Sequence, residues 1–174
     1  SDYDKVDTMK KLNIAIVIIS DSRTLRTDKS GKLLKKLIEQ NGHKIFDRVI
    51  IPDNVYKIRS VVSEFIVNEK VDVIISSGGT GITGTDGTPE AVRVLLDKEI
   101  EGFGELFRML SFNQIKTSSL QTRCLAGVSN STFIFVLPGS AHACKTAWEE
   151  IICHQLNSNT KPCNLVMLMP RLKE

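Results

Sequence analysis

A glycine-rich loop between a predicted strand and a predicted helix constrains this chain more than any other feature. Residues 71–77 are largely apolar and rich in β-branched side chains, as is typical of a strand buried on both faces. Five of the ten residues from Gly78 to Gly87 are glycine, and Thr88 and Pro89 then predict a helix start. Such a loop lets the backbone approach a ligand closely, and the helix N-terminus favours an anion. The loop therefore predicts a phosphate-binding site, with a purely structural turn as the alternative.

One carboxylate, that of Asp86, lies inside this loop. An acid beside a bound phosphate repels it unless a cation lies between them, so the loop and Asp86 together indicate phosphate and Mg²⁺. Asp86 could instead cap the helix that begins at Thr88. The loop lacks the Gly-Lys-Ser/Thr ending of a Walker A motif and matches the dinucleotide fingerprint only loosely, so neither motif applies.

Predicted strands and helices alternate along the first hundred residues. Apolar runs at 12–19, 45–51 and 71–77 predict strands, and helical spacing follows each of them. This order predicts right-handed βαβ crossovers and a mostly parallel sheet covered on both faces. Residues 123–128 and 132–137 predict a hairpin, and hence one antiparallel pair. The expected fold is an α/β three-layer sandwich with a mostly parallel sheet plus one antiparallel hairpin.

The later helices are expected in three places. The glycine loop leads into a helix through Leu95 and Leu96, and Gly102-Phe103-Gly104 precedes a second helical stretch. Within that stretch Glu105 and Arg108 have the spacing of a solvated (i, i+3) pair. Pro138-Gly139-Ser140 opens a long helix, in which Ser140 is either a simple cap or also a ligand contact.

Polar side chains follow the predicted strands where ligands bind in α/β proteins. Ser20 and Asp21 end the first strand, and Asp53 lies between the second strand and a helix. An aspartate in that position is usually an N-cap, so a catalytic role for Asp53 is the less common alternative.

Composition excludes several classes of protein. The net charge of +3 is spread over both signs with no basic stripe, which argues against a nucleic-acid partner. No run reaches the 18 apolar residues of a membrane span, and the four cysteines show no CxxC spacing, so we expect a cytoplasmic protein with reduced, mostly packing cysteines. The three histidines are not at metal-ligand spacing. We expect a mobile tail over residues 1–10 and a single domain over residues 11–174.

Five blocks in order along the chain resemble the MoaB/MogA family of molybdenum cofactor biosynthesis proteins. They are Ser77-Gly78-Gly79-Thr80-Gly81, Thr88-Pro89-Glu90-Ala91, Gly102-Phe103-Gly104-Glu105, Leu137-Pro138-Gly139-Ser140 and Lys161-Pro162-Cys163-Asn164. The resemblance runs from Ile14 to about Leu172, and the chain is most similar to the MoaB branch. Residues 107–112 and 147–149 fit the pattern of that branch.

The resemblance implies a molybdopterin-binding fold, a homotrimer or hexamer, and contact with other enzymes of molybdenum cofactor synthesis. It also implies a reaction in which molybdopterin and Mg-ATP give adenylyl-molybdopterin and pyrophosphate. Asp53 and Asp86 match the family's catalytic aspartates and would hold Mg²⁺ or orient the phosphates. The pterin and phosphate pocket would be formed by Ser20, Asp21, Ser77, Gly78, Gly79, Thr80, Gly81, Pro138, Gly139 and Ser140.

One departure from the family pattern bears on turnover. Active adenylyltransferases of the family usually carry Arg-Asp-Val-Thr-Pro where this chain has Thr85-Asp86-Gly87-Thr88-Pro89. The missing arginine removes a cation beside a triphosphate, and the added glycine loosens the loop. The alternatives to an adenylyltransferase are therefore a non-catalytic molybdopterin carrier or assembly factor, and a generic nucleotide-binding scaffold.

Overall fold

The computed structural model of the chain describes residues 9–174. Its strands are β1 (Asn13–Ile19), β2 (Lys44–Ile51), β3 (Val73–Ser77), β4 (Lys98–Glu99), β5 (Leu125–Ser129) and β6 (Thr132–Leu137). Its α-helices are α1 (Lys29–Gln40), α2 (Val55–Val67), α3 (Thr88–Arg93), α4 (Glu101–Ile115), α5 (Ala141–Ala147) and α6 (Cys153–Gln155). A π-helical stretch (Trp148–Ile152) joins α5 to α6, and two 3₁₀ helices cover Lys116–Gln121 and Val166–Arg171.

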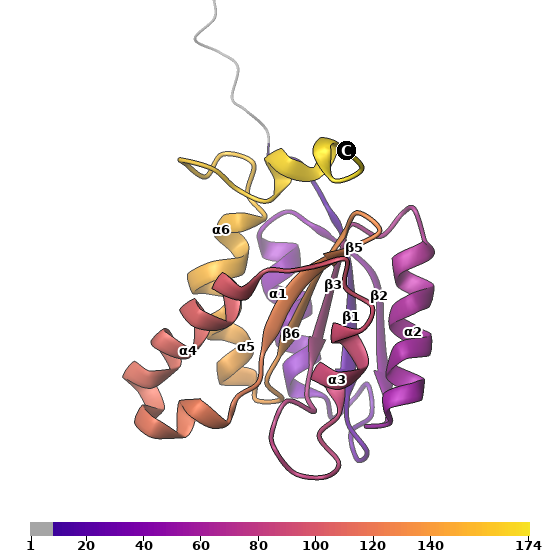
Figure 1. The fold of residues 1–174 in the computed structure, drawn as a ribbon, viewed down its shortest axis with the longest axis vertical. Coiled ribbons are helices and arrows are strands. Elements are labelled where there is room, and N and C mark those ends of the chain that lie inside the picture. The colour runs from indigo at the N-terminus through magenta and orange to yellow at the C-terminus, as the bar shows by residue number, and fades with distance from the viewer. Residues whose placement is uncertain (1–8) are drawn as a thin grey trace, which may run out of the picture.

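The strands form one six-stranded sheet in the order β2-β1-β3-β6-β5-β4 (Figure 1). The pairs β1–β2, β1–β3 and β3–β6 are parallel, whereas β5 pairs antiparallel with both β6 and β4. The predicted mostly parallel sheet and its hairpin are confirmed. Strand β4 adds a second antiparallel pair that the sequence did not predict, because two residues are too few to show an alternating pattern.

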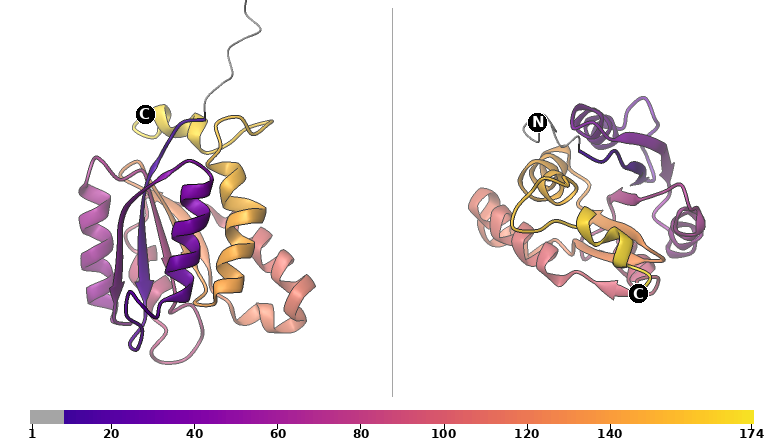
Figure 2. Two further views of the ribbon diagram at one scale, coloured as in Figure 1. Left: turned by 180° about the vertical axis from the view of Figure 1, so that it is seen from behind. Right: turned by 90° about the horizontal axis from the view of Figure 1, so that it is seen from above.

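Helices cover both faces of the sheet, which gives three layers (Figure 2). Strand β1 shows the arrangement most clearly, because its side chains alternate between two cores. Ile14, Ile16 and Ile18 pack in one core with residues of α1, α4 and the π-helical stretch, including Leu34, Phe107 and Trp148. Ala15, Val17 and Ile19 pack in the other core with residues of α2 and α3, including Ile58, Val62 and Val92. Burial of both faces explains why these strands read as continuous apolar runs.

Side-chain caps start three of the helices. Asp28 accepts a hydrogen bond from the N–H of Gly31 at the start of α1, and Ser140 accepts one from Ala143 at the start of α5. Asn54 caps α2 by accepting from Tyr56 and Lys57. The predicted cap by Ser140 is confirmed. Since Asn54 caps α2, the alternative that Asp53 does so is wrong.

Two predicted boundaries were also wrong. Helix α3 ends at Arg93, before Leu95 and Leu96, because the chain turns there to form the edge strand β4. Gly102 and Gly104 lie inside α4 instead of before it. A Cβ added to Gly104 would lie 3.1 Å from the carbonyl oxygen of Cys124, so glycine at this position lets the helix pack closely on the start of β5.

Residues 1–8, which make up most of the predicted mobile tail, lie outside the described residues. The placement of a single domain over residues 11–174 stays a prediction. Within the described part of the chain, no helix is both long enough and apolar enough to cross a membrane.

Candidate functional site

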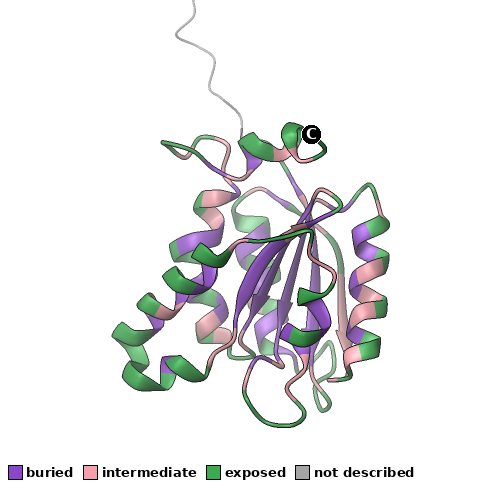
Figure 3. Ribbon diagram, in the orientation of Figure 1, coloured by how far each residue is buried: buried purple, intermediate pink, exposed green. Residues whose placement is uncertain are grey.

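Four loops meet at the carboxyl edge of the parallel strands. They follow β1, β2, β3 and β6, and these strands are neighbours in the sheet. The glycine loop is the large loop at the bottom of Figure 1, and the C-terminus lies at the opposite end of the molecule, at the top. The central strands are buried whereas the loops at this edge are largely exposed (Figure 3). An α/β sheet binds ligands in such a position, outside the strand ends where the chain reverses its direction of winding.

The first two glycines of the loop hold it against its neighbours. Gly78 and Gly79 have φ values of +110° and +70°, a region that side chains other than glycine rarely adopt. A Cβ on Gly78 would lie 2.3 Å from the carbonyl oxygen of Ile19, and one on Gly139 would lie 3.5 Å from the Cα of Gly78. The backbones that follow β1, β3 and β6 therefore lie in close contact.

The Asp53 carboxylate reaches this loop from β2. Its Oδ1 accepts a hydrogen bond from the N–H of Gly87 at 3.3 Å, and a Cβ on Gly79 would lie 2.9 Å from its Oδ2. The N–H of Asp53 in turn donates to Oδ1 of Asp21 at 3.0 Å. The structure thus links the ends of β1 and β2 to both sides of the glycine loop.

The Asp86 carboxylate folds back over the same loop. Its Oδ2 accepts hydrogen bonds from the N–H of Thr83 at 3.0 Å and the hydroxyl of Thr83 at 2.7 Å, and a Cβ on Gly81 would lie 2.6 Å from it. Helix α3 begins at Thr88, its N-cap residue is Gly87, and it has no side-chain cap hydrogen bond. The alternative that Asp86 caps this helix is therefore wrong.

The two carboxylates differ in their electrostatic surroundings. Burial raises the pKa of Asp53 above its usual value, and the negative charges of Asp86, Asp21 and Glu90 raise it further against one hydrogen bond from Gly87. The pKa of Asp86 is lowered, mainly by the hydrogen bond from the Thr83 side chain. A ligand or ion that brings positive charge would relieve the repulsion around Asp53.

Arg123, which precedes β5, braces the loop from outside. Its N–H donates to the carbonyl oxygen of Thr80 at 3.0 Å, its Nε to Gly81 at 2.8 Å, and a terminal nitrogen to the carbonyl of Asp86 at 3.0 Å. The guanidinium also forms an ion pair with Glu90 of α3. With three loop carbonyls engaged by one residue, the loop is fixed at both ends of its turn. The sequence did not predict this role for Arg123, because the local pattern at position 123 indicates only the start of a strand.

Comparison with known proteins identifies the family of the chain. Residues 15–158 match a family model described as "Probable molybdopterin binding domain". The chain belongs to this family of molybdopterin-binding domains. Within it the chain falls in the MoaB branch, as the sequence blocks predicted.

The chain and its relatives in this family are similar over most of their length. It is 48% identical to molybdenum cofactor biosynthesis protein B of Escherichia coli K12 over 92% of this chain and 93% of the relative. A crystal structure of a molybdenum cofactor biosynthesis protein B superposes with a TM-score of 0.85 at 40% identity, covering 94% of this chain and 97% of the other. The molybdopterin biosynthesis enzyme MoaB of Thermus thermophilus has a TM-score of 0.73 at 28% identity, covering 81% and 89%. The molybdopterin-binding fold is thereby confirmed.

Not every predicted pocket residue of this family member turns its side chain outward. Ser77 is buried and its hydroxyl donates to the carbonyl oxygen of Pro138 at 2.8 Å, while the side chain of Thr80 is also buried. The Ser20 hydroxyl accepts from the N–H groups of Ser22 and Arg23 and so forms a turn. These three residues shape the backbone of the site. The predicted pair of Glu105 with Arg108 is absent, because Arg108 donates to the carbonyls of Thr122 and Cys124.

The donor set fits a Mg²⁺ ion that is shared with phosphate. Among the described residues, no group of three or more His, Cys, Asp or Glu side chains could hold a metal ion alone. Asp53 and Asp86 supply two carboxylates beside the glycine backbone. Mg²⁺ is commonly bound by one or two carboxylates together with substrate phosphates and water, so the Mg²⁺ that the resemblance implies is compatible with these residues.

Two hollows lie near residues that contact the glycine loop, although no residue of 78–87 lines either of them. One, of about 600 Å³, lies over the ends of β1 and β2, and its lining includes Ser20, Asp21, Arg23, Thr24, Arg48 and Pro52. The other, of about 490 Å³, lies beside Arg123, and its lining includes Arg93, Glu99, Glu105, Arg108 and Leu120. Arginine side chains line both hollows, and the planar guanidinium group is well suited to bind phosphate.

Proposed function

We propose that this chain transfers AMP from Mg-ATP to the terminal phosphate of molybdopterin, giving adenylyl-molybdopterin and pyrophosphate. The observation that carries the proposal is the approach of two carboxylates, Asp53 and Asp86, to the backbone of one glycine loop. Such an arrangement suits a reaction in which several phosphates and a cation must be held together.

In the proposed reaction an oxygen of the molybdopterin phosphate attacks the α-phosphorus of ATP. One phosphorus–oxygen bond forms there, and the bond from the α-phosphorus to the α–β bridging oxygen breaks, so that pyrophosphate leaves with the electron pair. Asp53 and Asp86 would hold Mg²⁺, which would supply neutralisation of the phosphate charges. The backbone N–H groups of the loop bind and orient the phosphates, and no covalent protein nucleophile is needed.

The direct test is conversion by the pure protein. Incubation with molybdopterin, ATP and Mg²⁺ should release pyrophosphate and form adenylyl-molybdopterin, both detectable by chromatography. If molybdopterin stays bound and intact and no product rises above background, the proposal fails.

A non-catalytic molybdopterin-binding role is the second candidate. It is favoured by Thr85, which stands where active family members carry an arginine and whose hydroxyl lies 3.2 Å from that of Thr83. Arg123 does not replace the missing cation freely, because its guanidinium is engaged by Glu90 and by loop carbonyls. This candidate predicts molybdopterin binding without ATP dependence. Tight Mg-ATP binding by calorimetry would count against it.

We also propose that the chain assembles into the homotrimer or hexamer that the resemblance implies. The support is a row of exposed apolar side chains on α4. Leu106, Met109, Phe112 and Ile115 are 48–58% exposed, and Leu120 after the helix is 73% exposed. An apolar row of this kind on one helix is typical of a surface that another subunit covers.

A further inference from the structure

The hollow over the ends of β1 and β2 is lined by a positively charged side chain, that of Arg23, which has no role in the proposed reaction so far. Arg23 is exposed, and its backbone N–H is fixed by the hydroxyl of Ser20 at 3.0 Å. Among the described residues, the Arg23 guanidinium has no hydrogen-bond or ion-pair partner. An arginine on a fixed backbone, with its charge uncompensated and lining a hollow of about 600 Å³, is suited to bind an anion.

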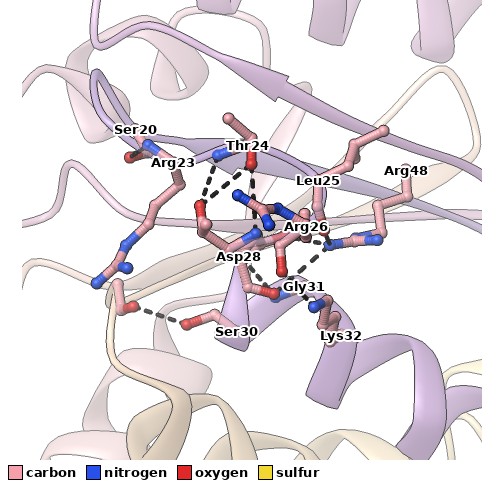
Figure 4. A network of polar contacts seen from close by, with 12 residues as sticks. Ser20, Arg23, Thr24, Leu25, Arg26, Asp28, Ser30, Gly31, Lys32 and Arg48 are labelled. Atoms are coloured by element: carbon pink, nitrogen blue, oxygen red, sulfur yellow. Dashed lines mark hydrogen bonds and ion pairs between the residues drawn. The ribbon is translucent and has the colours of Figure 1, made fainter.

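A network of polar contacts braces the loop that carries Arg23 (Figure 4). Arg48 of β2 donates to the carbonyl of Leu25 at 2.8 Å and forms an ion pair with Asp28 at 3.0 Å. The Asp28 side chain is only 2% exposed and also caps α1. Between Arg23 and Asp28, the chain makes a turn that is closed by hydrogen bonds between Thr24 and Thr27. Figure 4 shows the Arg23 side chain extending away from this loop, whereas the Arg48 side chain reaches toward it from the opposite side.

The roles of the two arginines therefore differ. The charge of Arg48 is compensated by Asp28, so Arg48 serves as the brace. Arg23 keeps all its donors for a ligand. Because the brace fixes the backbone in advance, little conformational entropy of the loop is lost when an anion binds.

The hollow adjoins the loop that carries Asp53 of the proposed metal site, because Pro52 and Asp21 lie in its lining. Asp21 lies in its lining, and Oδ1 of Asp21 accepts the N–H of Asp53 at 3.0 Å. A ligand that reached from the glycine loop past Asp53 would enter this hollow. Two acids at the entrance favour a phosphate chain that arrives with its cation, and disfavour a bare anion.

The geometry of in-line displacement indicates which substrate group would occupy the hollow over β1 and β2. The attacking and leaving oxygens lie on opposite sides of the phosphorus in phosphoryl and nucleotidyl transfer. The strand order places the β1–β2 hollow on one side of the β3 loop, and the loop after β6 on the other side. If the α-phosphate lies at the glycine loop, the leaving pyrophosphate on one side requires the attacking phosphate on the other.

We propose that the hollow over β1 and β2 binds the β- and γ-phosphates of Mg-ATP, and that Arg23 is the cation that contacts them. This inference rests on the proposed function and identifies the subsite of the leaving group. It places the molybdopterin phosphate on the side of Pro138 to Ser140. Arg23 thus supplies charge that the chain lacks at Thr85.

The test compares two arginines of the same loop by calorimetry in the presence of Mg²⁺. Arg26 is also exposed but does not line the hollow, so Arg26→Ala removes the same charge as a matched control. Loss of a charge-assisted contact should weaken binding of Mg-ATP and of inorganic tripolyphosphate to Arg23→Ala by about 10-fold or more. Binding of AMP and of molybdopterin should be unchanged, Arg23→Lys should keep part of the affinity, and Arg26→Ala should behave as wild type. Thermal unfolding of each variant checks the fold.

The outcomes separate this inference from the proposed function. Equal tripolyphosphate affinity of Arg23→Ala and wild type, equal losses in both alanine variants, or no tripolyphosphate binding by wild type would each overturn the subsite, whatever the turnover assay shows. Selective weakening in Arg23→Ala supports the subsite even if the wild-type protein forms no adenylyl-molybdopterin, in which case only the proposed reaction fails.

Discussion

Ionisation of the Asp53 carboxyl group is disfavoured by burial and by the negative charges of Asp86, Asp21 and Glu90. Its pKa is therefore higher in the folded chain than in the unfolded chain, and the folded chain binds its proton more tightly. The ionised form consequently lowers the free energy of unfolding above the folded-state pKa, and this loss disappears as the pH falls below the unfolded-state pKa.

We expect Asp53→Asn to be at least as stable as wild type at pH 7, although it should lose turnover. The amide oxygen can still accept the N–H of Gly87, while the repulsion is removed. Urea unfolding at a series of pH values measures the difference, which should shrink as the solution becomes acidic. A variant that is clearly less stable at pH 7 would show that the ionised carboxylate contributes to the fold.

Asp86→Asn should remove turnover while the fold stays intact. The change keeps an oxygen for the Thr83 donors but removes the charge proposed to hold Mg²⁺. We expect kcat/KM to fall by about 100-fold or more, since even outer groups of a metal site cost 10- to 100-fold. Asp47→Asn, at an exposed position of β2, is the control. An unchanged rate would show that Asp86 only orders its own loop.

Arg123→Ala should loosen the glycine loop. It removes the side-chain bonds to Gly81, Asp86 and Glu90, and part of the positive charge that lowers the pKa of Asp86. We expect a loss of about 1–3 kcal/mol in the free energy of unfolding, and faster amide exchange over residues 80–87. Arg93→Ala is the matched control, because its ion pair with Glu99 is largely exposed and contributes little. Equal effects in both variants would contradict the brace.

Single residues of the site were predictable where a backbone pattern marked them. The glycine loop predicted a backbone with little side-chain cover, as at Gly78 and Gly79, and strand ends marked Asp21 and Asp53. Arg123 could not be predicted in this way, since its partners Gly81 and Glu90 are more than thirty positions away in the sequence. A long side chain gives no local signal of which distant carbonyls it will reach.

At the scale of elements, α4 presents a surface that the described chain leaves uncovered. Met109→Glu places a charge in its apolar row, where it would be desolvated in an assembled interface. We expect sedimentation to show trimers or hexamers for wild type and smaller species for the variant. Val67→Glu, at a 71% exposed position of α2, should leave the assembly unchanged. A wild-type monomer would contradict the proposed assembly.

Long periodic elements were predicted well, and short ones were not. The apolar runs located β1, β2, β3 and β6, and the cap Ser140 was identified from local sequence. The end of α3 and the strand β4 depend on pairing of Lys98 and Glu99 with β5, which is a tertiary contact. The local propensity of two residues cannot predict such a pairing, because the pairing depends on the partner strand.

At the scale of the whole molecule, the cysteines should report global unfolding. Burial raises the pKa of Cys124 and of Cys144 to about 11, whereas Cys163 is exposed. Iodoacetamide should therefore modify Cys163 in the native state and reach the two buried thiols only when the core opens. Mass spectrometry across a urea series measures this order. Early modification of Cys144 would indicate local opening beneath the site.

The overall architecture could be predicted because every level of the sequence agreed with it. Alternation of strands and helices fixed the three layers, and the right-handed crossover rule limited the sheet order. The relation between the two hollows could not be predicted, since it depends on where β6 inserts. That strand lies beside β3 although 54 residues separate Ser77 from Thr132.

The central place of β6 has a consequence for synthesis of the chain. When a ribosome has released β1, β2 and β3, three of the four loops of the site exist, but the strand that pairs with β3 has not yet emerged. The open edge of β3 must wait for residues 132–137, and the loop after β6 follows only then. A nascent chain therefore has no complete pocket in which to retain a pterin, and loading with ligand belongs to the finished polypeptide.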